Sequence, residues 1–342
     1  MVKGGANFSS EELVRVLSHY DIGIVHKVQA LSVGNRRAPK VIVTADKGMF
    51  LLKRRPKGRD DLEKVGFAHA VQKHLASKAF PVTSLLATMD ERVTAFNMDN
   101  HVYEVFRFVE GIRYDGSLEA TREAGRQLAV FHKDLVDFKG GDEPSPLCFH
   151  DADLVRRHLR LLSSDRRTEA ARRMQAVAEE LLLRYDKSCV RVNQLGFRAW
   201  KRQVVHGDWH PGNLLFEGQK VVAVVDFDSI RYSPAVTDLA NGMLQFSIVG
   251  DRPDPTQWSA HFDRNRLFEF FNGYREVTRL SERKRYGLID MMIETMIAEA
   301  VLPVAATGFF GHHSGQAFLE MILRKTKWLR RSRRELREVM MT

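Results

Sequence analysis

The sequence predicts an α+β fold with two lobes, a small β-rich N-terminal lobe over residues 1–110 and a larger helical lobe over residues 111–342. Short runs in which apolar and polar residues alternate occur through the first lobe, as expected for strands with one buried face. Beyond residue 111 the apolar residues recur at the spacing of amphipathic helices. A third observation, a group of acids and an amide in the middle of the chain, indicates where the chemistry takes place.

Length and composition are those of an ordinary globular protein. The chain has 342 residues, enough for one large domain or two modest ones with buried cores. The first ten residues lack the apolar core of a signal peptide, and the longest apolar stretch is interrupted by Glu299 and Pro303. The two cysteines form no C-x-x-C motif. We therefore expect a cytoplasmic protein with reduced thiols and no transmembrane segment. No pattern predicts an oligomeric state.

The net charge of +10 raises the question of an anionic partner. Nucleic acid, an anionic lipid surface and an anionic substrate are the candidates. The sequence contains no helix-turn-helix, zinc-knuckle or aromatic RNA-binding signature. We therefore expect no specific nucleic-acid partner and interpret the basic residues as solvated helix faces. Some arginines within residues 151–187 could instead face an acceptor, and the basic end, residues 324–337, could bind a partner or an anionic surface.

The first lobe is predicted to begin with a helix at residues 9–20, because Ser9 and Glu12 form a capping box before an apolar face. A second helix is predicted over residues 60–78. Strands are expected at residues 24–28, 40–44, 49–53 and within 82–109. Gly111 marks the expected boundary between the lobes. The second lobe is predicted to contain helices over residues 119–137, within 151–187 and within 258–328.

The group of acids and an amide begins with His206-Gly207-Asp208, continues with Asn213, and ends, after an apolar run, in Asp226-Phe227-Asp228. Metal-dependent phosphoryl transfer needs such a set, because one carboxylate orients the acceptor hydroxyl while an amide and a second carboxylate hold Mg²⁺ on the phosphates of ATP. The spacing predicts that Asp208 is the catalytic residue and that Asn213 and Asp226 bind Mg²⁺. The alternative is a surface hairpin with two unrelated acids.

The pattern H-G-D-x-H-x-x-N, followed by a strand and D-F-D, resembles that of the aminoglycoside phosphotransferase, choline kinase and homoserine kinase superfamily. Protein kinases have the same spacing in H-R-D-x-x-x-x-N and D-F-G. The resemblance covers about residues 23–240. It implies a protein-kinase-like fold and the transfer of the γ-phosphoryl group of ATP to a hydroxyl of a small-molecule acceptor.

The resemblance also implies where the nucleotide binds. Lys53, at the end of a predicted strand, would contact the α- and β-phosphates. Gly34 and Asn35 lie in the loop expected to cover the phosphates, although a single glycine makes this motif weak. Backbone groups near Phe108 would meet the adenine, and they do not distinguish ATP from GTP. His206, His132 and Asp238 are expected to support the catalytic loop.

The sequence departs from the family where a carboxylate usually fixes the lysine. The expected helix position falls at Ala68 or His69, and neither is acidic. Glu63 is the only glutamate of that helix and lies more than a turn earlier. Either Glu63 reaches Lys53 or Lys53 relies on the phosphates alone, and the distance along the helix favours the second alternative.

Two other functions fit parts of the sequence. A pseudokinase scaffold would explain the missing glutamate, but the intact Asp208, Asn213 and Asp226 argue against it. A kinase acting on protein Ser/Thr would need a longer activation segment ending in A-P-E, which is absent. The acceptor itself, whether homoserine, an aminoglycoside, choline or a sugar, is not encoded in any motif.

Overall fold

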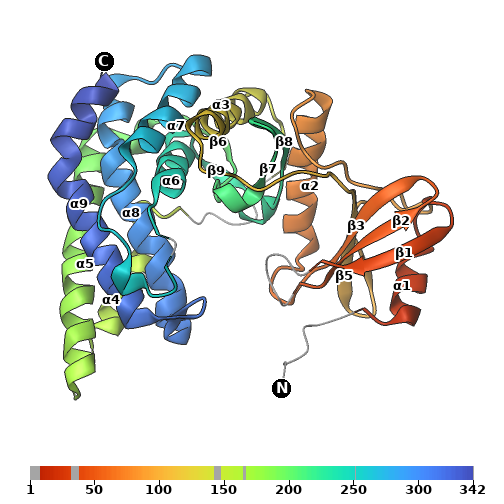
Figure 1. Ribbon diagram of the computed structural model, residues 1–342, viewed down its shortest axis with the longest axis horizontal. Coiled ribbons are helices and arrows are strands. Elements are labelled where there is room, and N and C mark those ends of the chain that lie inside the picture. Colours follow the sequence, from red (N-terminus) through yellow and green to blue (C-terminus); the bar gives the residue numbers. More distant parts are fainter. Residues whose placement is uncertain (1–7, 32–37, 142–147, 165–166, 251, 342) are drawn as a thin grey trace. The chain divides into compact units, whose positions relative to one another are not determined.

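The computed structural model describes residues 8–31, 38–141, 148–164, 167–250 and 252–341. The chain forms two compact units (Figure 1). The first comprises Met1–Arg113, Asp134–Pro144 and Asn213–Ile230. The second comprises Tyr114–Lys133, Ser145–Gly212 and Arg231–Thr342.

A five-stranded antiparallel sheet in the order β1-β2-β3-β5-β4 forms the frame of the first unit. The strands are β1 (Val25–Ala30), β2 (Lys40–Ala45), β3 (Gly48–Arg54), β4 (Phe96–Met98) and β5 (His101–Arg107). Helix α1 (Ser10–Leu17) begins with the predicted capping box of Ser9 and Glu12 and packs its buried residues against one face of the sheet.

Alternation along β3 decides which residues reach the other face of the sheet. Phe50 and Leu52 belong to the core shared with α1, so Leu51 and Lys53 point to the opposite side. Helix α2 (Leu62–Ser77) lies on that side, because its His69 contacts Glu104 of β5.

A β-hairpin completes the first unit. Strands β7 (Leu214–Glu217) and β8 (Lys220–Val224) pair antiparallel across a turn with Gly218 at a φ of 55°, a left-handed conformation that favours glycine. Bridges from Val82 to Val224 and from Ile112 to Phe216 attach the hairpin to the rest of the unit.

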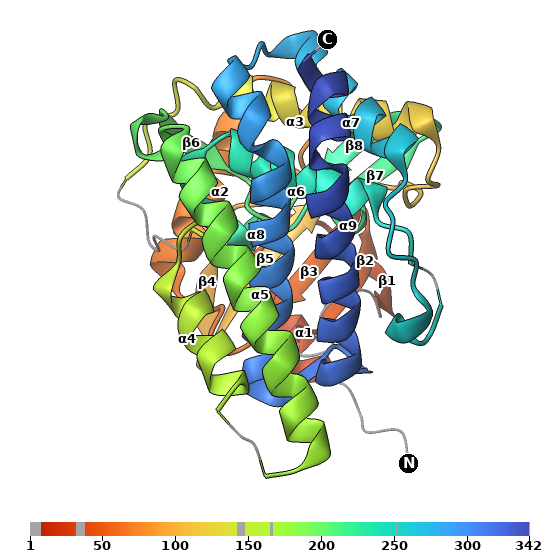
Figure 2. The same cartoon turned by 90° about the vertical axis from the view of Figure 1, so that its left-hand side faces the viewer.

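The second unit is mostly helical. Its helices are α3 (Leu118–Asp134), α4 (Asp153–Leu162), α5 (Glu169–Gln194), α6 (Val236–Ser247), α7 (Arg264–Val277), α8 (Glu282–Thr307) and α9 (Gly315–Met341), joined by the strand pairs β6 (Arg202–Val205) with β9 (Arg231–Pro234) and β10 (Phe309–Phe310) with β11 (His313–Ser314). Helices α5, α8 and α9 run side by side (Figure 2). Helix α8 is buried on nearly all sides between Gly287 and Val304 and forms the centre of this bundle.

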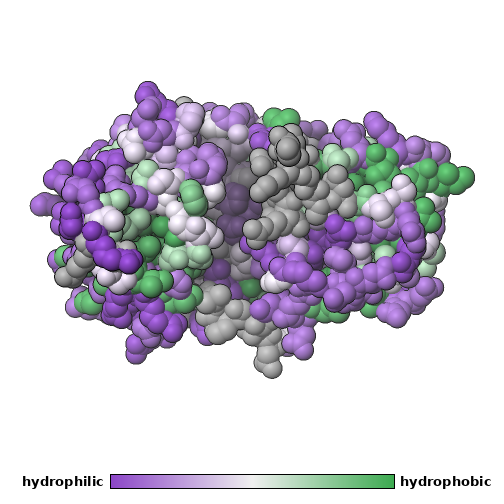
Figure 3. Space-filling view, turned by 90° about the horizontal axis from the view of Figure 1, so that it is seen from below, coloured by the Kyte–Doolittle hydropathy of each residue, from purple (hydrophilic) through white to green (hydrophobic). Residues whose placement is uncertain are grey.

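The surface of the protein is drawn from one side in Figure 3. Most of the face drawn in Figure 3 is hydrophilic, with smaller hydrophobic areas between. Within the described ranges, no helix combines the length and the apolar character that crossing a membrane requires.

Candidate active site

The β7–β8 hairpin brings the two predicted metal ligands to its open end. Asn213 directly precedes β7, Asp226 follows β8 by two residues, and the Val225 amide donates a 2.9 Å hydrogen bond to the Asn213 carbonyl. Asn213 is buried, whereas Asp226 is exposed and has a φ of 62°, a left-handed conformation that Asp tolerates better than most residues. An amide oxygen and a carboxylate are hard oxygen ligands, and they suit Mg²⁺.

Lys53 is held between two carboxylates of the first unit. Glu104 lies directly opposite Lys53 in the β3–β5 register, and its Oε1 is 3.1 Å from Nζ. Asp228 approaches the same Nζ to 3.7 Å. Burial by itself would lower the pKa of Lys53, but the charges of Glu104 and Asp228 outweigh it and raise the pKa above its ordinary value. The lysine therefore remains a cation.

Both alternatives that the sequence offered for Lys53 are wrong. Glu63 is exposed in the first turn of α2, and Lys53 does not stand alone. The helix instead contributes His69, whose Nε2 lies 2.9 Å from Glu104 and whose Nδ1 lies 2.9 Å from the Thr94 hydroxyl. The acid that pairs with the lysine therefore lies on the neighbouring strand β5 and not on the helix, where the family pattern places it.

Glu104 is the centre of this network. It is fully buried, and its Oε2 also lies 3.1 Å from Nε of Arg55. Burial would raise the pKa of Glu104, but the charge of Lys53 and the hydrogen bond from His69 hold the pKa well below its usual range. A buried carboxylate of this kind is stable only because positive partners surround it.

Three further residues of the network were not singled out from the sequence. Arg55 donates a 2.8 Å hydrogen bond to Asp228, the last residue of D-F-D. Lys40 lies opposite Lys53 in the β2–β3 register, and both burial and the charge of Lys53 lower its pKa. Asp228 occupies the position of the glycine in the kinase motif D-F-G, and this difference could have identified it from the sequence. Lys40 could be placed beside Lys53 only from the register of the strands.

The other residues predicted to meet the nucleotide are Gly34, Asn35 and Phe108. Gly34 and Asn35 lie outside the described residues. Phe108 follows β5, and its amide donates a 2.9 Å hydrogen bond to the Met49 carbonyl. That amide is therefore used within the sheet.

In the second unit, buried residues hold the loop that carries Asp208. The amides of His206 and Gly207 donate hydrogen bonds of 2.6 and 2.9 Å to the carboxylate of Asp238. His132 bridges Asp238 and the Tyr274 hydroxyl, with contacts of 3.3 and 2.9 Å. This arrangement confirms the expected supporting roles of His132 and Asp238.

The side chains around Asp208 differ from Asp208 itself in exposure. Trp209 is fully buried, and its ring packs edge-on against His206 and close to Phe131. The Asp208 side chain keeps 40% of its surface exposed, with a carboxylate oxygen 3.7 Å from Nε2 of His210. The loop is therefore rigidly anchored, while its carboxylate is accessible to a substrate.

A pocket of about 400 Å³ lies in the same unit. It begins at Pro211 of the catalytic loop, and its wall includes the aromatic residues Trp258 and Phe318 and the ionisable residues Glu299 and Lys325. Burial, followed by the charge of Asp208, raises the pKa of Glu299 to about 8. Pro211 places this pocket beside the catalytic loop, and its size suits a small molecule.

Comparison with known proteins gives the family. Residues 27–280 match the model of the phosphotransferase enzyme family. The chain belongs to this family. A homoserine kinase from Zymomonas mobilis is 24% identical to this phosphotransferase over 288 residues, which cover 83% of the chain and 82% of the relative.

Solved structures support the same fold. The microcompartment-associated aminopropanol kinase matches the phosphotransferase with a TM-score of 0.70 at 15% identity, over 96% of this chain and 98% of that one. An amicoumacin kinase, solved with AMP-PNP and Ca²⁺, matches with a TM-score of 0.66 at 14% identity, over 97% and 94% of the two chains. The predicted superfamily and the two-lobed, protein-kinase-like α+β fold are confirmed.

The family match does not extend over the whole phosphotransferase. The matched region contains Lys53, Glu104, Asp208 and the hairpin residues, but it ends before α8 and α9. Glu299 and Lys325 of the pocket therefore come from the part of the chain that the family model leaves out.

Proposed function

We propose that the protein transfers the γ-phosphoryl group of ATP, with Mg²⁺, to a hydroxyl group of a small molecule. Family membership makes the chain a phosphotransferase. The finer proposal rests chiefly on one observation, the ionised Lys53 fixed by Glu104 in the unit that also carries Asn213 and Asp226. The AMP-PNP and Ca²⁺ of the amicoumacin kinase structure agree with a nucleotide and a divalent cation.

The site residues of the first unit hold the nucleotide. Lys53, positioned by Glu104 and Asp228, binds the α- and β-phosphates. The oxygens of Asn213 and Asp226 would hold Mg²⁺, and the bound ion would supply positive charge to the phosphates. Because Glu104, Arg55 and His69 are fixed before substrate arrives, little reorganisation accompanies nucleotide binding.

Asp208 acts on the acceptor. Its exposed carboxylate orients the hydroxyl and takes its proton as the new bond from the acceptor oxygen to the γ-phosphorus forms. The bond from the γ-phosphorus to its bridging oxygen breaks, and ADP leaves. Asp238 keeps the loop in place through the His206 and Gly207 amides.

The pocket beside the catalytic loop favours an acceptor that carries an amine. Its aromatic wall offers rings to a cation, and Glu299, whose pKa is about 8, ionises readily once a cation binds beside it. The homoserine kinase and the aminopropanol kinase both act on hydroxylated amines by name, which supports this class.

An ATP-consumption screen tests the proposal. The panel contains homoserine, aminopropanol, choline, aminoglycosides and amine-free polyols, each with Mg²⁺. We expect turnover with a hydroxylated amine, and we expect Asp208→Asn to lower that turnover by about 10²–10⁴ while nucleotide affinity is kept. Tight nucleotide binding without turnover on any acceptor would support a pseudokinase instead. Unchanged turnover in Asp208→Asn would remove the role of Asp208.

A further inference from the structure

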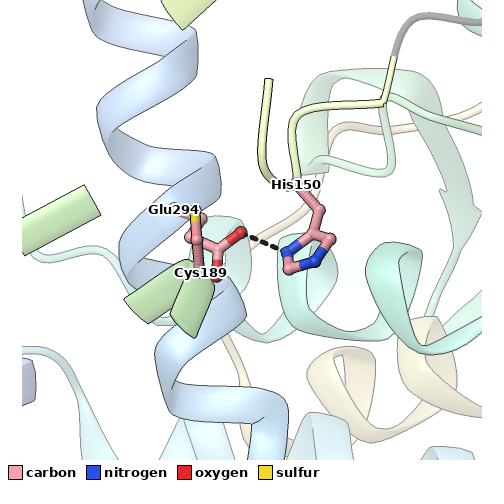
Figure 4. Close-up of side chains that lie close together, drawn as sticks. All are labelled: His150, Cys189 and Glu294. Atoms are coloured by element: carbon pink, nitrogen blue, oxygen red, sulfur yellow. Dashed lines mark hydrogen bonds and ion pairs between the residues drawn. The ribbon is translucent and has the colours of Figure 1, made fainter. Parts of the chain in front are cut away.

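A second group of reactive side chains lies buried in the helical unit, among residues that phosphoryl transfer does not use. His150 precedes α4, Cys189 belongs to α5 and Glu294 belongs to α8 (Figure 4). One nitrogen, one sulfur and one carboxylate oxygen from these residues all lie within 4.8 Å of one another. Cys189 and Glu294 are each 1% exposed, and the side chain of His150 is 6% exposed.

The orientation of the His150 ring is fixed from outside the cluster. The Asn193 amide nitrogen donates a 2.9 Å hydrogen bond to Asp151, so the Asn193 amide oxygen faces Nε2 of His150 at 3.1 Å. Nε2 must therefore carry the hydrogen, and the lone pair of Nδ1 points into the cluster. Asp151 is in turn paired with Arg156. Metal-binding histidines are oriented by the same kind of outer hydrogen bonds.

One oxygen atom inside the cluster lacks a conventional hydrogen-bond donor, whereas the others are paired. Nδ1 of His150 lies 2.7 Å from Oε2 of Glu294, so these two groups share one proton. Oε1 of Glu294 is buried and accepts no hydrogen bond within the described part of the chain. The Cys189 thiol, a weak donor, lies close to the same carboxyl group. The Cys189 thiol carries a proton of its own, so the buried cluster holds two protons when it is uncharged.

We propose that His150, Cys189 and Glu294 bind a zinc ion. Imidazole nitrogen, thiolate and carboxylate form a mixed donor set that suits Zn²⁺ and not Mg²⁺ or Ca²⁺. Zn²⁺ replaces the thiol proton and the proton shared by His150 and Glu294, so two protons leave as one dication enters. The buried site is neutral before and after this exchange, which avoids the cost of an uncompensated charge.

The surroundings provide a place for the fourth ligand. A cavity of about 20 Å³ adjoins His150 and Glu294, and the polar side chains of Thr237, Asn241 and Thr295 also line it. This volume accommodates about one water molecule. Three protein ligands and one water complete the four-coordinate arrangement common for zinc.

The zinc ion would brace the segment beside the catalytic loop. Phe149, next to His150, packs under the guanidinium of Arg231 at 5.3 Å, and Arg231 donates a 3.3 Å hydrogen bond to the carbonyl of Gly207. Zinc joins this segment to α5 and α8, so its role is structural and distinct from the Mg²⁺ of the reaction.

Metal binding to the full-length protein tests the proposal directly. The protein is treated with a chelator, returned to buffer with excess Mg²⁺, and titrated with Zn²⁺ and separately with Co²⁺. We expect about one ion per chain, release of about two protons per ion, and a thiolate-to-cobalt charge-transfer band. Cys189→Ser should abolish the band, and Glu294→Gln should lower affinity by at least about tenfold. Cys148→Ser, which removes the other cysteine, should bind as the parent does.

Several results of this titration would overturn the proposed zinc site. Equal zinc retention by Cys189→Ser and the parent, or a cobalt complex without the thiolate band, would overturn the proposal, as would failure of the parent to bind either ion. Circular dichroism shows whether Cys189→Ser folds, and the nearly isosteric Glu294→Gln gives a second measurement if it does not. Zinc should also raise the melting temperature of the parent and not that of a folded ligand variant.

Discussion

Lys53 obtains its carboxylate from a strand, and this changes what each neighbour does. Glu104 approaches from the directly opposite position on β5, where the two backbones already fix the distance. His69 of α2 then binds the far side of Glu104 instead of contacting the lysine. The helix therefore acts on the lysine through an intermediate residue, Glu104.

Glu104→Gln should impair use of ATP, because Lys53 loses its nearest charge and its position. A double-mutant cycle with Lys53→Met, read from kcat/KM, should give about 0.5–3 kcal/mol of interaction energy. Glu63→Gln is the matched control and should be nearly neutral, because Glu63 is exposed in the first turn of α2. Additive losses at Glu104 and Lys53 would show that the two residues act independently.

Substitutions at Asp226 and at Asp228 should have different effects, because the first residue is expected to bind the metal and the second positions Lys53. Asp226→Ala should abolish the Mg²⁺-dependent part of ATP affinity, because an exposed carboxylate beside Asn213 is lost. Asp228→Asn should keep a Mg²⁺ dependence while lowering ATP affinity, because Asp228 contacts Lys53 and Arg55. Calorimetry with and without Mg²⁺ measures both effects. The assignment of Asp226 fails if its variant retains the parent's Mg²⁺ dependence.

At the level of elements, short-range patterns were enough for the strands and the first helices, but not for their partners. The capping box of Ser9 and Glu12 and the alternation in β3 are local, and both were predicted correctly. The pairing of β3 with β5 joins segments separated by α2 and β4, and no local pattern encodes that register. The partner of Lys53 could therefore not be predicted.

Close contact between α3 and α7 depends on glycine. A Cβ atom at Gly125 would lie 2.0 Å from the carbonyl oxygen of Phe270, which is backbone and cannot rotate away. Gly125→Ala should therefore destabilise the protein by about 1–3 kcal/mol or more, measured by chemical denaturation.

Gly66 provides the control for this prediction. It lies within α2, and a Cβ atom there would meet nothing within 4 Å. Gly66→Ala should therefore be neutral or stabilising by about 0.4–1 kcal/mol, because it lowers the entropy of the unfolded chain. A Gly125→Ala variant as stable as Gly66→Ala would mean that the helices separate without cost.

For the whole molecule, the catalytic motif and the acceptor pocket differ in how far the sequence reveals them. The motif from His206 to Asp228 is short, although it supplies Asp208 to one compact unit and Asn213 and Asp226 to the other. Its spacing was sufficient to predict the family. The pocket is formed by side chains that are widely separated along the chain, such as Tyr114, Glu299 and Lys325, and only the folded unit brings them together.

The pH dependence of the protein's stability should reflect the protonation of Glu299. The pKa of this carboxyl is about 8 in the folded protein against an ordinary value of 4.5. Between these values the folded protein holds a proton that the unfolded chain has lost, so the free energy of unfolding attributable to Glu299 falls as the pH rises and levels off above about 8. Glu299→Gln has no such proton. The melting temperature of Glu299→Gln, taken relative to that of the parent, should increase as the pH is raised from 5 to 8. Glu282→Gln, an exposed change on the same helix, should show the same pH profile as the parent. Parallel profiles for the parent and Glu299→Gln would mean that Glu299 is ionised throughout, and that the pocket is more polar than its aromatic wall suggests.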